Sequence, residues 1–371
     1  SGVDQFMEST VKEIASKFCI KDNFIKAEPF GSGHINDTYK VVYSVDGKNV
    51  KYIFQKINTK VFRKPENLME NVSRVLDHSA KKLGSLPDSE RRCIHLVPTV
   101  DGKMYYIDGD ECWRSYKFID NARTYNTLET EEQAYQAAKA FGNFQMLLAD
   151  LPGERLHETI PNFHNTRKRY ESLDEAIRLD AVGRLKEVQP EIDYLMKSRD
   201  AACLLTDMGN AGSLPRRVTH NDTKINNVLF DKDTNDSLVV IDLDTVMPGL
   251  MGHDFGDAIR FAANFVAEDS KEYDKVGIDL AVFTAFAQGF LEKLGTAMTQ
   301  NELDTLAQSC FCLTAELAVR FLDDYLRGNL YFKTSYPAHN LVRARNQIAL
   351  CRSMEAHMDE MNAIVHRCAK V

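Results

Sequence analysis

The sequence has few features that would place the chain in a membrane or on nucleic acid. It has no run of about 18 apolar residues and no apolar segment near its N-terminus, so it predicts neither a membrane span nor a signal peptide. Its formal net charge is −8 at pH 7, whereas nucleic-acid binding needs a basic face. We therefore expect no membrane partner and no nucleic-acid partner. ATP needs only a local positive patch, so the acidic balance does not exclude it.

Cysteine pairs with metal-binding spacing are also lacking. The 8 cysteines are scattered, and only Cys310 and Cys312 are close together. Two residues with that separation do not face each other on a helix, so a metal site there is not expected. Free thiols in a reducing cytoplasm are the simpler interpretation. No internal repeat is visible, and 371 residues are enough for two domains.

A P-loop is missing as well. Gly31-Ser32-Gly33 is not followed by Gly-Lys-Ser/Thr, and no helical pattern begins there. The glycines lie between two β-like segments, where they would let backbone N–H groups approach an anion closely. Taken alone, the turn favours a plain hairpin. Together with the loop described next, it favours a turn over the phosphates of a nucleotide.

The most informative stretch runs from Arg217 to Gly249. It contains His220-x-Asp222-x-x-x-x-Asn227, and then an apolar run that ends at Asp242. Phosphoryl transfer needs one carboxylate to accept a proton from the attacking hydroxyl, and oxygen ligands that hold Mg²⁺ on the phosphates. Asp222 fits the first role, and Asn227 with Asp242 fits the second, because Mg²⁺ needs only a few protein oxygens. The alternative is an Asx-rich turn that caps two strands.

Other polar residues of this stretch are expected in supporting roles. His220 is expected to bond backbone carbonyls and hold the loop, with proton transfer as the less favoured alternative. Lys224 either stabilises charge on the transferring phosphoryl group or is exposed. Asp244 is expected either as a second metal ligand or as a residue that contacts the first ligand without touching the metal. Asp254 is expected as a helix N-cap or as a residue that holds the loop.

Hydrophobic patterning predicts an α+β protein whose strands come first. The expected strands are 24–30, 38–45, 50–57, 97–100, 104–107 and 113–119, with helices at 5–18 and 65–82. Asp46-Gly47 and Asp101-Gly102 are two-residue hairpin signals. Later helices are expected at 130–150, 271–293, 302–327 and 338–365, with two surface helices within 163–200. Thr299-x-x-Glu302 predicts a capping box, and Gly328 predicts a helix end.

Six blocks spread over the chain resemble a known family. They are G-S-G-H-I-N-D-T-Y (31–39), Y-K-F-I (116–119), T-H-N-D-T-K-I-N-N (219–227), I-D-L-D-T-V-M-P-G (241–249), D-F-G-D-A-I-R-F (254–261) and Y-P-A-H-N-L-V-R (336–343). The loop at 219–227 resembles that of aminoglycoside phosphotransferases and choline kinases. The whole set resembles bacterial N-acetylhexosamine 1-kinases. This implies a bilobal, protein-kinase-like fold, with a small antiparallel β lobe at 1–120 and a large, mainly helical lobe at 121–371. The small lobe would hold an N-terminal helix, five strands and one inserted helix.

The resemblance also implies binding residues. For the nucleotide these are Gly31, Ser32, Gly33, Ile35, Gln55, Lys117 and Ile119. Protein kinases keep a phosphate-binding lysine where this chain has Gln55, and strand alternation turns Lys56 to the opposite face. This leaves open what neutralises the phosphates. Glu66 or Glu70 would pair with such a lysine, and a solvated helix face is the alternative for them.

For the sugar, the resemblance implies His34, Asn36, Asp222, Phe261, Arg320 and Tyr331, with Val319 near them. A guanidinium can bridge a hydroxyl and an amide carbonyl, which suits an N-acetylated sugar. Two alternatives remain open. Asn36 and Asp37 would only cap the turn, and Glu316 with Arg320 would form a surface ion pair.

These observations predict an Mg²⁺- and ATP-dependent kinase that phosphorylates the anomeric hydroxyl of a free N-acetylhexosamine. Its partners would be the sugar and the nucleotide, and its oligomeric state, for which a monomer is a plausible form, is left open. One alternative is the same chemistry on choline, ethanolamine, homoserine, methylthioribose or an aminoglycoside. Another is a kinase fold that binds without catalysing.

Overall fold

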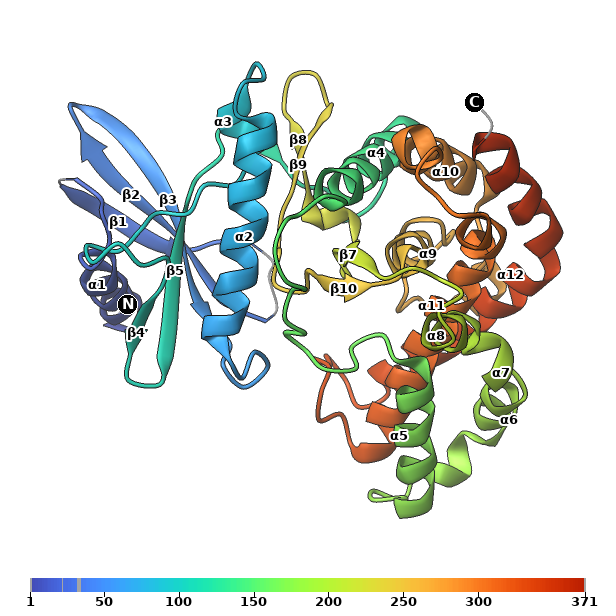
Figure 1. Cartoon of the computed structure of the whole chain (residues 1–371). Helices are drawn as coiled ribbons and strands as arrows, with labels where there is room; N and C mark the ends of the chain where they lie inside the picture. The colour runs from blue at the N-terminus through green and yellow to red at the C-terminus, as the bar shows by residue number, and fades with distance from the viewer. Residues whose placement is uncertain (1, 22, 32–34, 370–371) are drawn as a thin grey trace. The chain divides into compact units, whose positions relative to one another are not determined.

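The computed structural model describes residues 2–21, 23–31 and 35–369, and it forms two compact units (Figure 1). The first, which we call the sheet unit, comprises Ser1–Ala122, Asp150–Ile160 and Ile241–Val246. The second, the helical unit, comprises Arg123–Ala149, Pro161–Val240 and Met247–Val371. A small antiparallel β unit and a larger helical unit confirm the predicted α+β class.

The sheet unit is built on five antiparallel strands in the order β1-β2-β3-β5-β4. They are β1 (Phe24–Pro29), β2 (Asp37–Val45), β3 (Lys48–Ile57), β4 (Tyr106–Asp108) and β5 (Glu111–Lys117). The β2–β3 turn at Asp46-Gly47 has φ values of 51° and 78°, the left-handed pair that a two-residue hairpin requires. This predicted hairpin is therefore confirmed.

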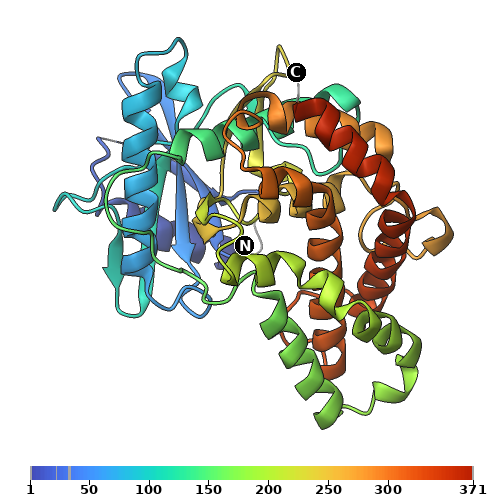
Figure 2. The same ribbon diagram turned by 45° about the vertical axis from the view of Figure 1, so that its right-hand side comes forward.

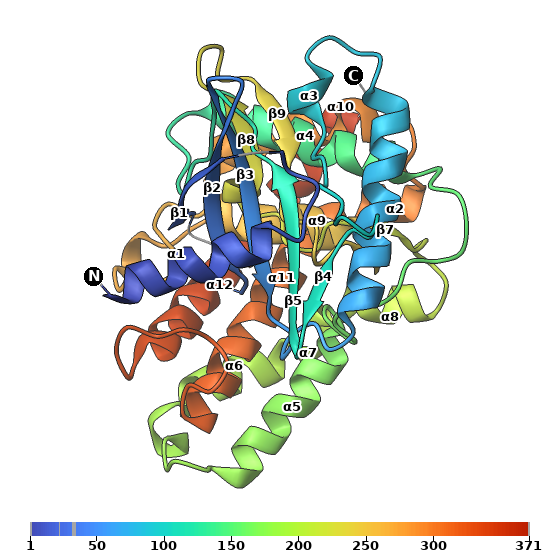
Figure 3. The ribbon, with the colours of Figure 1, turned by 90° about the vertical axis from the view of Figure 1, so that its left-hand side faces the viewer.

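Helices lie on both faces of this sheet (Figure 3). Helix α1 (Gly2–Ala15) packs Val11 and Ile14 into one buried cluster with Phe54 and Trp113. Because side chains alternate along a strand, the neighbours of Phe54 and Trp113 point to the opposite face. There helix α2 (Pro65–Leu83) lies, and a short helix α3 (Ser89–Arg92) follows it. One face of the sheet is thus apolar core, and the other carries the polar Gln55 and Arg114 beside the buried Ile57 and Cys112.

The hairpin predicted over 97–100 and 104–107 is wrong. A tight turn does form, since the Thr99 N–H donates to the Lys103 carbonyl at 2.7 Å. The flanking residues make only isolated bridges, Phe18 with Thr99 and Leu96 with Tyr116. The ladder forms one turn later, where β4 pairs with β5. The Asp101-Gly102 dipeptide therefore forms a turn, but the residues that flank it do not pair as a hairpin.

The helical unit is built around one long helix, α11 (Gln300–Arg327), which packs against α5, α9 and α12 (Figure 2). Its helices are α4 (Glu131–Leu148), α5 (Thr166–Leu179), α6 (Gln189–Lys197), α7 (Arg199–Ala202), α8 (Leu204–Asn210), α9 (Met251–Ala262), α10 (Leu280–Leu294), α11 and α12 (His339–Ala369). Three single 3₁₀ turns are η1 (Leu185–Glu187), η2 (Ile225–Asn227) and η3 (Tyr273–Lys275). Its short strands are β7 (Arg217–Thr219), β8 (Val228–Asp231), β9 (Ser237–Val240) and β10 (Met247–Gly249), and β6 (Ala122–Arg123) spans the boundary between the two units in sequence.

Both predicted ends of α11 are confirmed. Thr299 accepts a hydrogen bond from the Glu302 N–H, and the Glu302 side chain bonds back to the Thr299 N–H, which completes the capping box. Gly328 ends the helix with a φ of 96°. By length and composition α11 could cross a membrane, but 83% of its apolar window is buried within the protein, as in a core helix.

The two surface helices expected within 163–200 form as α5 and α6, and each buries one stripe, with Tyr170, Leu173 and Leu195 in the core. Charged residues dominate the composition of this segment and hide its buried stripe. The helix expected at 271–293 begins only at Leu280, after Asp279 as its N-cap.

Helices α4 and α10 approach each other too closely for any side chain larger than hydrogen at two places. A Cβ on Gly289 would lie 2.2 Å from the Tyr135 carbonyl oxygen. A Cβ on Gly142 would lie 2.5 Å from the Phe290 carbonyl oxygen. Close backbone approach of this kind is a use of glycine that outweighs its low helix propensity.

Candidate active site

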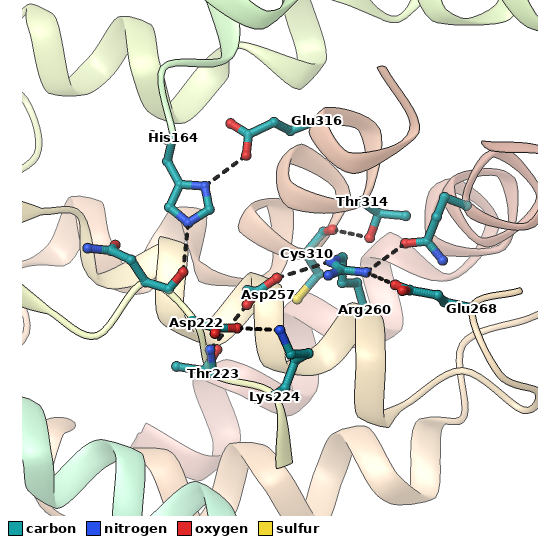
Figure 4. A network of polar contacts seen from close by, with 12 residues as sticks. His164, Asp222, Thr223, Lys224, Asp257, Arg260, Glu268, Cys310, Thr314 and Glu316 are labelled. Carbon is teal, nitrogen blue, oxygen red and sulfur yellow. Dashed lines mark hydrogen bonds and ion pairs between the residues drawn. The ribbon is translucent and has the colours of Figure 1, made fainter. Parts of the chain in front are cut away.

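The loop between β7 and η2 is held by side chains from α9. Asp254 accepts the backbone N–H of His220 at 2.9 Å on one oxygen and that of Asn221 at 2.8 Å on the other. Asp257 accepts the N–H of Thr223 at 3.2 Å (Figure 4). Buried N–H groups that have no ladder partner need such acceptors. The loop backbone is therefore fixed in one conformation.

Asp254 holds the loop from inside a helix and does not cap one. Helix α9 begins at Met251, so the N-cap alternative for Asp254 is wrong and the loop-holding alternative is confirmed. The carboxylate is 1% exposed and also accepts a bond from Gln145 at 2.8 Å. Burial raises the pKa of Asp254, and His220 with the backbone N–H groups opposes that rise.

His220 supports the loop beside Asp222. Its ring is fully buried against the edges of Phe141 and Phe144, with centroids 5.8 and 5.7 Å away. The Asp222 N–H donates to its Nδ1 at 3.1 Å, so this bond uses a backbone N–H where a carbonyl was expected. The enclosed ring therefore holds the backbone of Asp222 in place through this bond.

Asp222 is half-buried and charged. Lys224 Nζ lies 2.8 Å from its Oδ1 (Figure 4). Burial alone would raise the pKa of Asp222, but Lys224, His220 and Asn227 outweigh it, so the pKa is lowered. The carboxylate is therefore ionised at neutral pH and able to accept a proton.

Asn227 lies at the end of the loop with its amide oriented. Its Nδ2 donates to the Asp222 carbonyl at 2.8 Å. This bond leaves the amide oxygen Oδ1 pointing away from that carbonyl, as a metal ligand must. Val228, the next residue, pairs with Val240 in the β8–β9 ladder. Asp242 follows Val240 by two residues. In the sequence, both predicted metal ligands therefore flank the same end of the β8–β9 hairpin.

A buried chain of polar groups leads from α11 to the catalytic loop. His164 Nδ1 lies 2.8 Å from Glu316 Oε2, and His164 Nε2 lies 3.3 Å from the Asn221 carbonyl oxygen (Figure 4). Thr166 donates to the other Glu316 oxygen at 3.0 Å. Glu316 is completely buried, so the alternative of a surface ion pair with Arg320 is wrong. Burial raises the pKa of Glu316, but His164, Arg169 and Arg320 lower it to about 2.

Arg320 lies one turn after Glu316 among aromatic rings. Its guanidinium carbon is 5.5 Å from the Phe163 centroid, 5.8 Å from Tyr331 and 5.4 Å from Phe332. Within the described part of the chain, no carboxylate lies in ion-pairing distance of it. The Tyr331 side chain is 61% exposed. The five N–H donors of the guanidinium thus face an aromatic surface that solvent can reach.

The two remaining residues suggested for the sugar, Phe261 and Val319, lie in different surroundings. Phe261 is half-buried near the end of α9. Val319 is completely buried in the core cluster of α11, so it cannot line a site for a sugar and that expectation is wrong.

In the sheet unit, sequence reasoning missed a buried arginine. Arg114 on β5 lies opposite Gln55 on β3 and is 2% exposed. Its Nη1 and Nη2 donate to the two oxygens of Asp244 at 2.5 and 2.8 Å. Its Nε and Nη2 donate to Gln55 Oε1 at 2.9 and 2.8 Å. The sequence signal for this residue was an arginine within a predicted strand. Such a signal cannot identify Asp244, its partner 130 residues away.

The other nucleotide candidates lie as follows. Ser32, Gly33 and His34 lie outside the described residues, and Gly31 has a φ of 79°. Ile35 and Lys117 are exposed, and Ile119 is half-buried. Lys56 pairs with Asp37 at 3.4 Å, on the face opposite Gln55 as predicted. Glu66 and Glu70 are both exposed, which favours the solvated helix face.

The predicted metal ligands fit Mg²⁺ in their chemistry. Asn227 and Asp242 offer hard oxygens, and Mg²⁺ usually takes one or two protein ligands with water and phosphate for the rest. Asp242 has a φ of 61°, an uncommon conformation that orients its side chain. Among the described residues no group of three or more His, Cys, Asp and Glu side chains forms a metal cluster, which is compatible with a site of this sparse kind.

Comparison with known proteins defines the class. Residues 26–286 match the model of the phosphotransferase enzyme family, the family of aminoglycoside phosphotransferases. An aminoglycoside phosphotransferase from Alicyclobacillus acidocaldarius has a similar structure, with a TM-score of 0.60, 12% identity and 96% of each chain covered. A choline kinase from Cryptosporidium parvum has a TM-score of 0.57, 15% identity and coverage of 98% and 99%. A spectinomycin phosphotransferase in complex with ADP and spectinomycin has a TM-score of 0.54, 13% identity and coverage of 98% and 99%.

The matched segment covers more than half of the chain and includes the loop, Asn227 and Asp242. The chain therefore belongs to the phosphotransferase enzyme family. Within this family its fold is that of the small-molecule kinases of the aminoglycoside phosphotransferase and choline kinase type.

Proposed function

We propose that the protein is a cytoplasmic, ATP-dependent N-acetylhexosamine 1-kinase. It would transfer the γ-phosphoryl group of ATP to the anomeric hydroxyl of free GlcNAc or GalNAc. ADP and AMP are bound in structures of a related spectinomycin phosphotransferase, which supports a nucleotide as co-substrate. The lobes proposed for the two substrates are residues 1–120 for the nucleotide and 121–371 for the sugar.

Asp222 is the proposed general base. It is ionised because Lys224, 2.8 Å away, lowers its pKa together with His220 and Asn227. The side chains of His220, Asp254 and Asp257 fix the loop that carries it. A fixed, ionised carboxylate can take the hydroxyl proton as the oxygen attacks phosphorus. Positioning of this kind is most of what a protein contributes to phosphoryl transfer.

Asn227 and Asp242 would hold Mg²⁺. When bound, the ion neutralises charge on the phosphates and orients them. The chain supplies the oriented amide of Asn227 and a carboxylate two residues beyond the paired Val240. Gly31, Ile35, Gln55, Lys117 and Ile119 remain the proposed nucleotide contacts in the described part of the chain.

The observation that carries the sugar assignment is the guanidinium of Arg320 among Phe163, Tyr331 and Phe332. A planar cation with open donors binds hydroxyl and amide oxygens, and aromatic rings bind the apolar faces of a sugar. Choline and other cationic alcohols would be repelled by Arg320. Phe261 and the undescribed His34 complete the proposed set, and Asn36 is not retained in it because Asp244 and the Asn58 N–H engage both ends of its amide.

An ADP-release assay across GlcNAc, GalNAc, choline and an aminoglycoside tests the proposal, with phosphorus NMR to locate the phosphate. We expect turnover on the two N-acetylhexosamines and a sugar 1-phosphate as the product. Turnover on choline or an aminoglycoside instead would identify a kinase of another alcohol. Nucleotide binding without turnover on any acceptor would identify a binding module.

Two substitutions refine the test. Asp222→Ala should lower kcat by about 10²–10⁴-fold, the contribution of a general base, while ATP still binds. Arg320→Ala should raise the KM for the sugar more than the KM for ATP. Arg345→Met serves as the matched control, because Arg345 pairs with Glu191 at 2.7 Å elsewhere in the helical unit.

A further inference from the structure

The segment Ile241–Val246 belongs to the sheet unit although it follows β9 of the helical unit in sequence. It carries the proposed metal ligand Asp242. Side chains from distant positions in the described part of the sheet unit bond to this segment. They are Arg114, Asn36, Thr159 and Asn71.

Asp244 receives most of these bonds. Arg114 contacts both of its oxygens, and Asn36 Nδ2 donates to Oδ2 at 2.7 Å. Thr159 donates to its backbone carbonyl at 2.9 Å. The Asp244 carboxylate is 2% exposed, so this pairing takes place away from water. A buried carboxylate with three charge-assisted or amide donors is held far more firmly than an exposed one.

Arg114 is in turn fixed by Gln55. The Gln55 Oε1 accepts two guanidinium N–H groups, and the Gln55 Nε2 donates to Thr38 at 3.1 Å. Burial alone would lower the pKa of Arg114, but Asp244, Tyr116 and Asp242 raise it, so the guanidinium stays charged. Gln55, at the position where protein kinases have a lysine, is thus part of the network that holds Asp244.

Asn36, which directly precedes β2, belongs to this network. Its Oδ1 accepts the Asn58 N–H at 2.8 Å, while its Nδ2 reaches Asp244. Both ends of this amide are therefore engaged within the sheet unit. One cluster of Arg114, Gln55, Asn36 and Asp244 joins β3, β5, the residue before β2 and the segment with Asp242.

We propose that this cluster positions Asp242 for Mg²⁺, with Asp244 acting through Arg114 and not as a second metal ligand. The inference rests on the proposed metal role of Asp242. It assigns Arg114 and Asp244 as positioning residues, because their charges are used on each other. It also explains why β3 carries a neutral glutamine, since a lysine there would face Arg114.

The first experiment follows hydrogen exchange in the protein without Mg²⁺ or nucleotide. Arg114→Met and Asp244→Asn should each raise the exchange rate of amides in 241–246 by at least about 10-fold over wild type, since the local opening free energy falls. Arg345→Met, which breaks a partly exposed ion pair with Glu191 in the helical unit, should leave this segment unchanged. Unchanged exchange in both cluster variants would overturn the proposal.

The second experiment measures binding of a fluorescent ATP analogue as Mg²⁺ is titrated. Both variants should raise the Mg²⁺ concentration at half-saturation by about 10–100-fold, the usual effect of losing a residue that orients a ligand. The double variant should need no more Mg²⁺ for half-saturation than the more impaired single variant, because the two residues act as a unit.

If Asp244 were itself a metal ligand, Asp244→Asn alone would raise the Mg²⁺ requirement and Arg114→Met would not. That pattern would refute the positioning role. Asp242→Ala reports separately on the proposed metal site: unchanged Mg²⁺ dependence there would remove Asp242, whatever the cluster variants do. Arg114→Lys should recover part of the loss, since it keeps the charge but not the bidentate geometry.

Discussion

Replacing Gln55 with lysine, the residue that protein kinases use at this position, should destabilise the protein. Gln55 Oε1 now accepts two N–H groups of the buried Arg114, and lysine has no acceptor. A second cation about 4 Å from the guanidinium adds roughly 4 kcal/mol of repulsion at an effective dielectric constant of about 20. Attraction to Asp244 offsets part of this. We expect the free energy of unfolding to fall by about 2–4 kcal/mol.

Denaturant unfolding of purified variants measures this difference. Gln55→Glu keeps an acceptor for Arg114 and should lose less stability than Gln55→Lys. The double variant Gln55→Lys with Arg114→Met removes one of the two facing cations and should recover more than half of the loss. Wild-type stability for Gln55→Lys alone would refute the electrostatic reasoning. So would an equal loss in the double variant, because the repulsion would then have no part in it.

Two further predictions concern the helical unit. Burial lowers the pKa of His253 to about 3, with His164 adding to the effect, whereas an unfolded histidine has a pKa near 6.5. The unfolded chain therefore binds a proton first, so stability should fall as the pH drops from about 6.5 toward 3, by at most about 1.4 kcal/mol per pH unit for this group. His253→Asn should flatten that part of a denaturation-versus-pH curve; an unchanged slope would contradict it. Gly289→Ala should lower stability by about 1–3 kcal/mol in thermal unfolding, because its Cβ would lie 2.2 Å from the Tyr135 carbonyl oxygen. A melting temperature equal to wild type would show that α4 and α10 can separate without cost.

Local chemistry made much of the fold predictable. The Asp46-Gly47 hairpin, the Thr299 capping box and the Gly328 helix end depend on residues close in sequence, and each is confirmed. The hairpin at Asp101-Gly102 failed because the same dipeptide forms a turn whether or not its flanks pair. Which strand pairs with β5 is settled by the whole sheet, and no local pattern records it.

The candidate site shows the same division. The H-x-D-x-x-x-x-N spacing brought attention to Asp222 and Asn227, which are neighbours along one loop. The pairing of Arg114 with Asp244 and that of His164 with Glu316 span more than a hundred residues each, so periodicity could not reveal them. Glu316 also illustrates a limit of spacing rules. Its separation of four from Arg320 suggested an exposed pair, while the fold turned the carboxylate into the core.

The membership of Ile241–Val246 in the sheet unit has a practical consequence for anyone who wishes to divide this chain. A fragment that stops at Ala122 would contain Arg114 but not Asp244, and so would enclose a permanent cation with no counter-ion. Such fragments tend to misfold or aggregate, since an uncompensated charge inside a small core is costly. A stable version would need Arg114 replaced by an apolar residue, or both missing segments, Asp150–Ile160 and Ile241–Val246, joined through linkers.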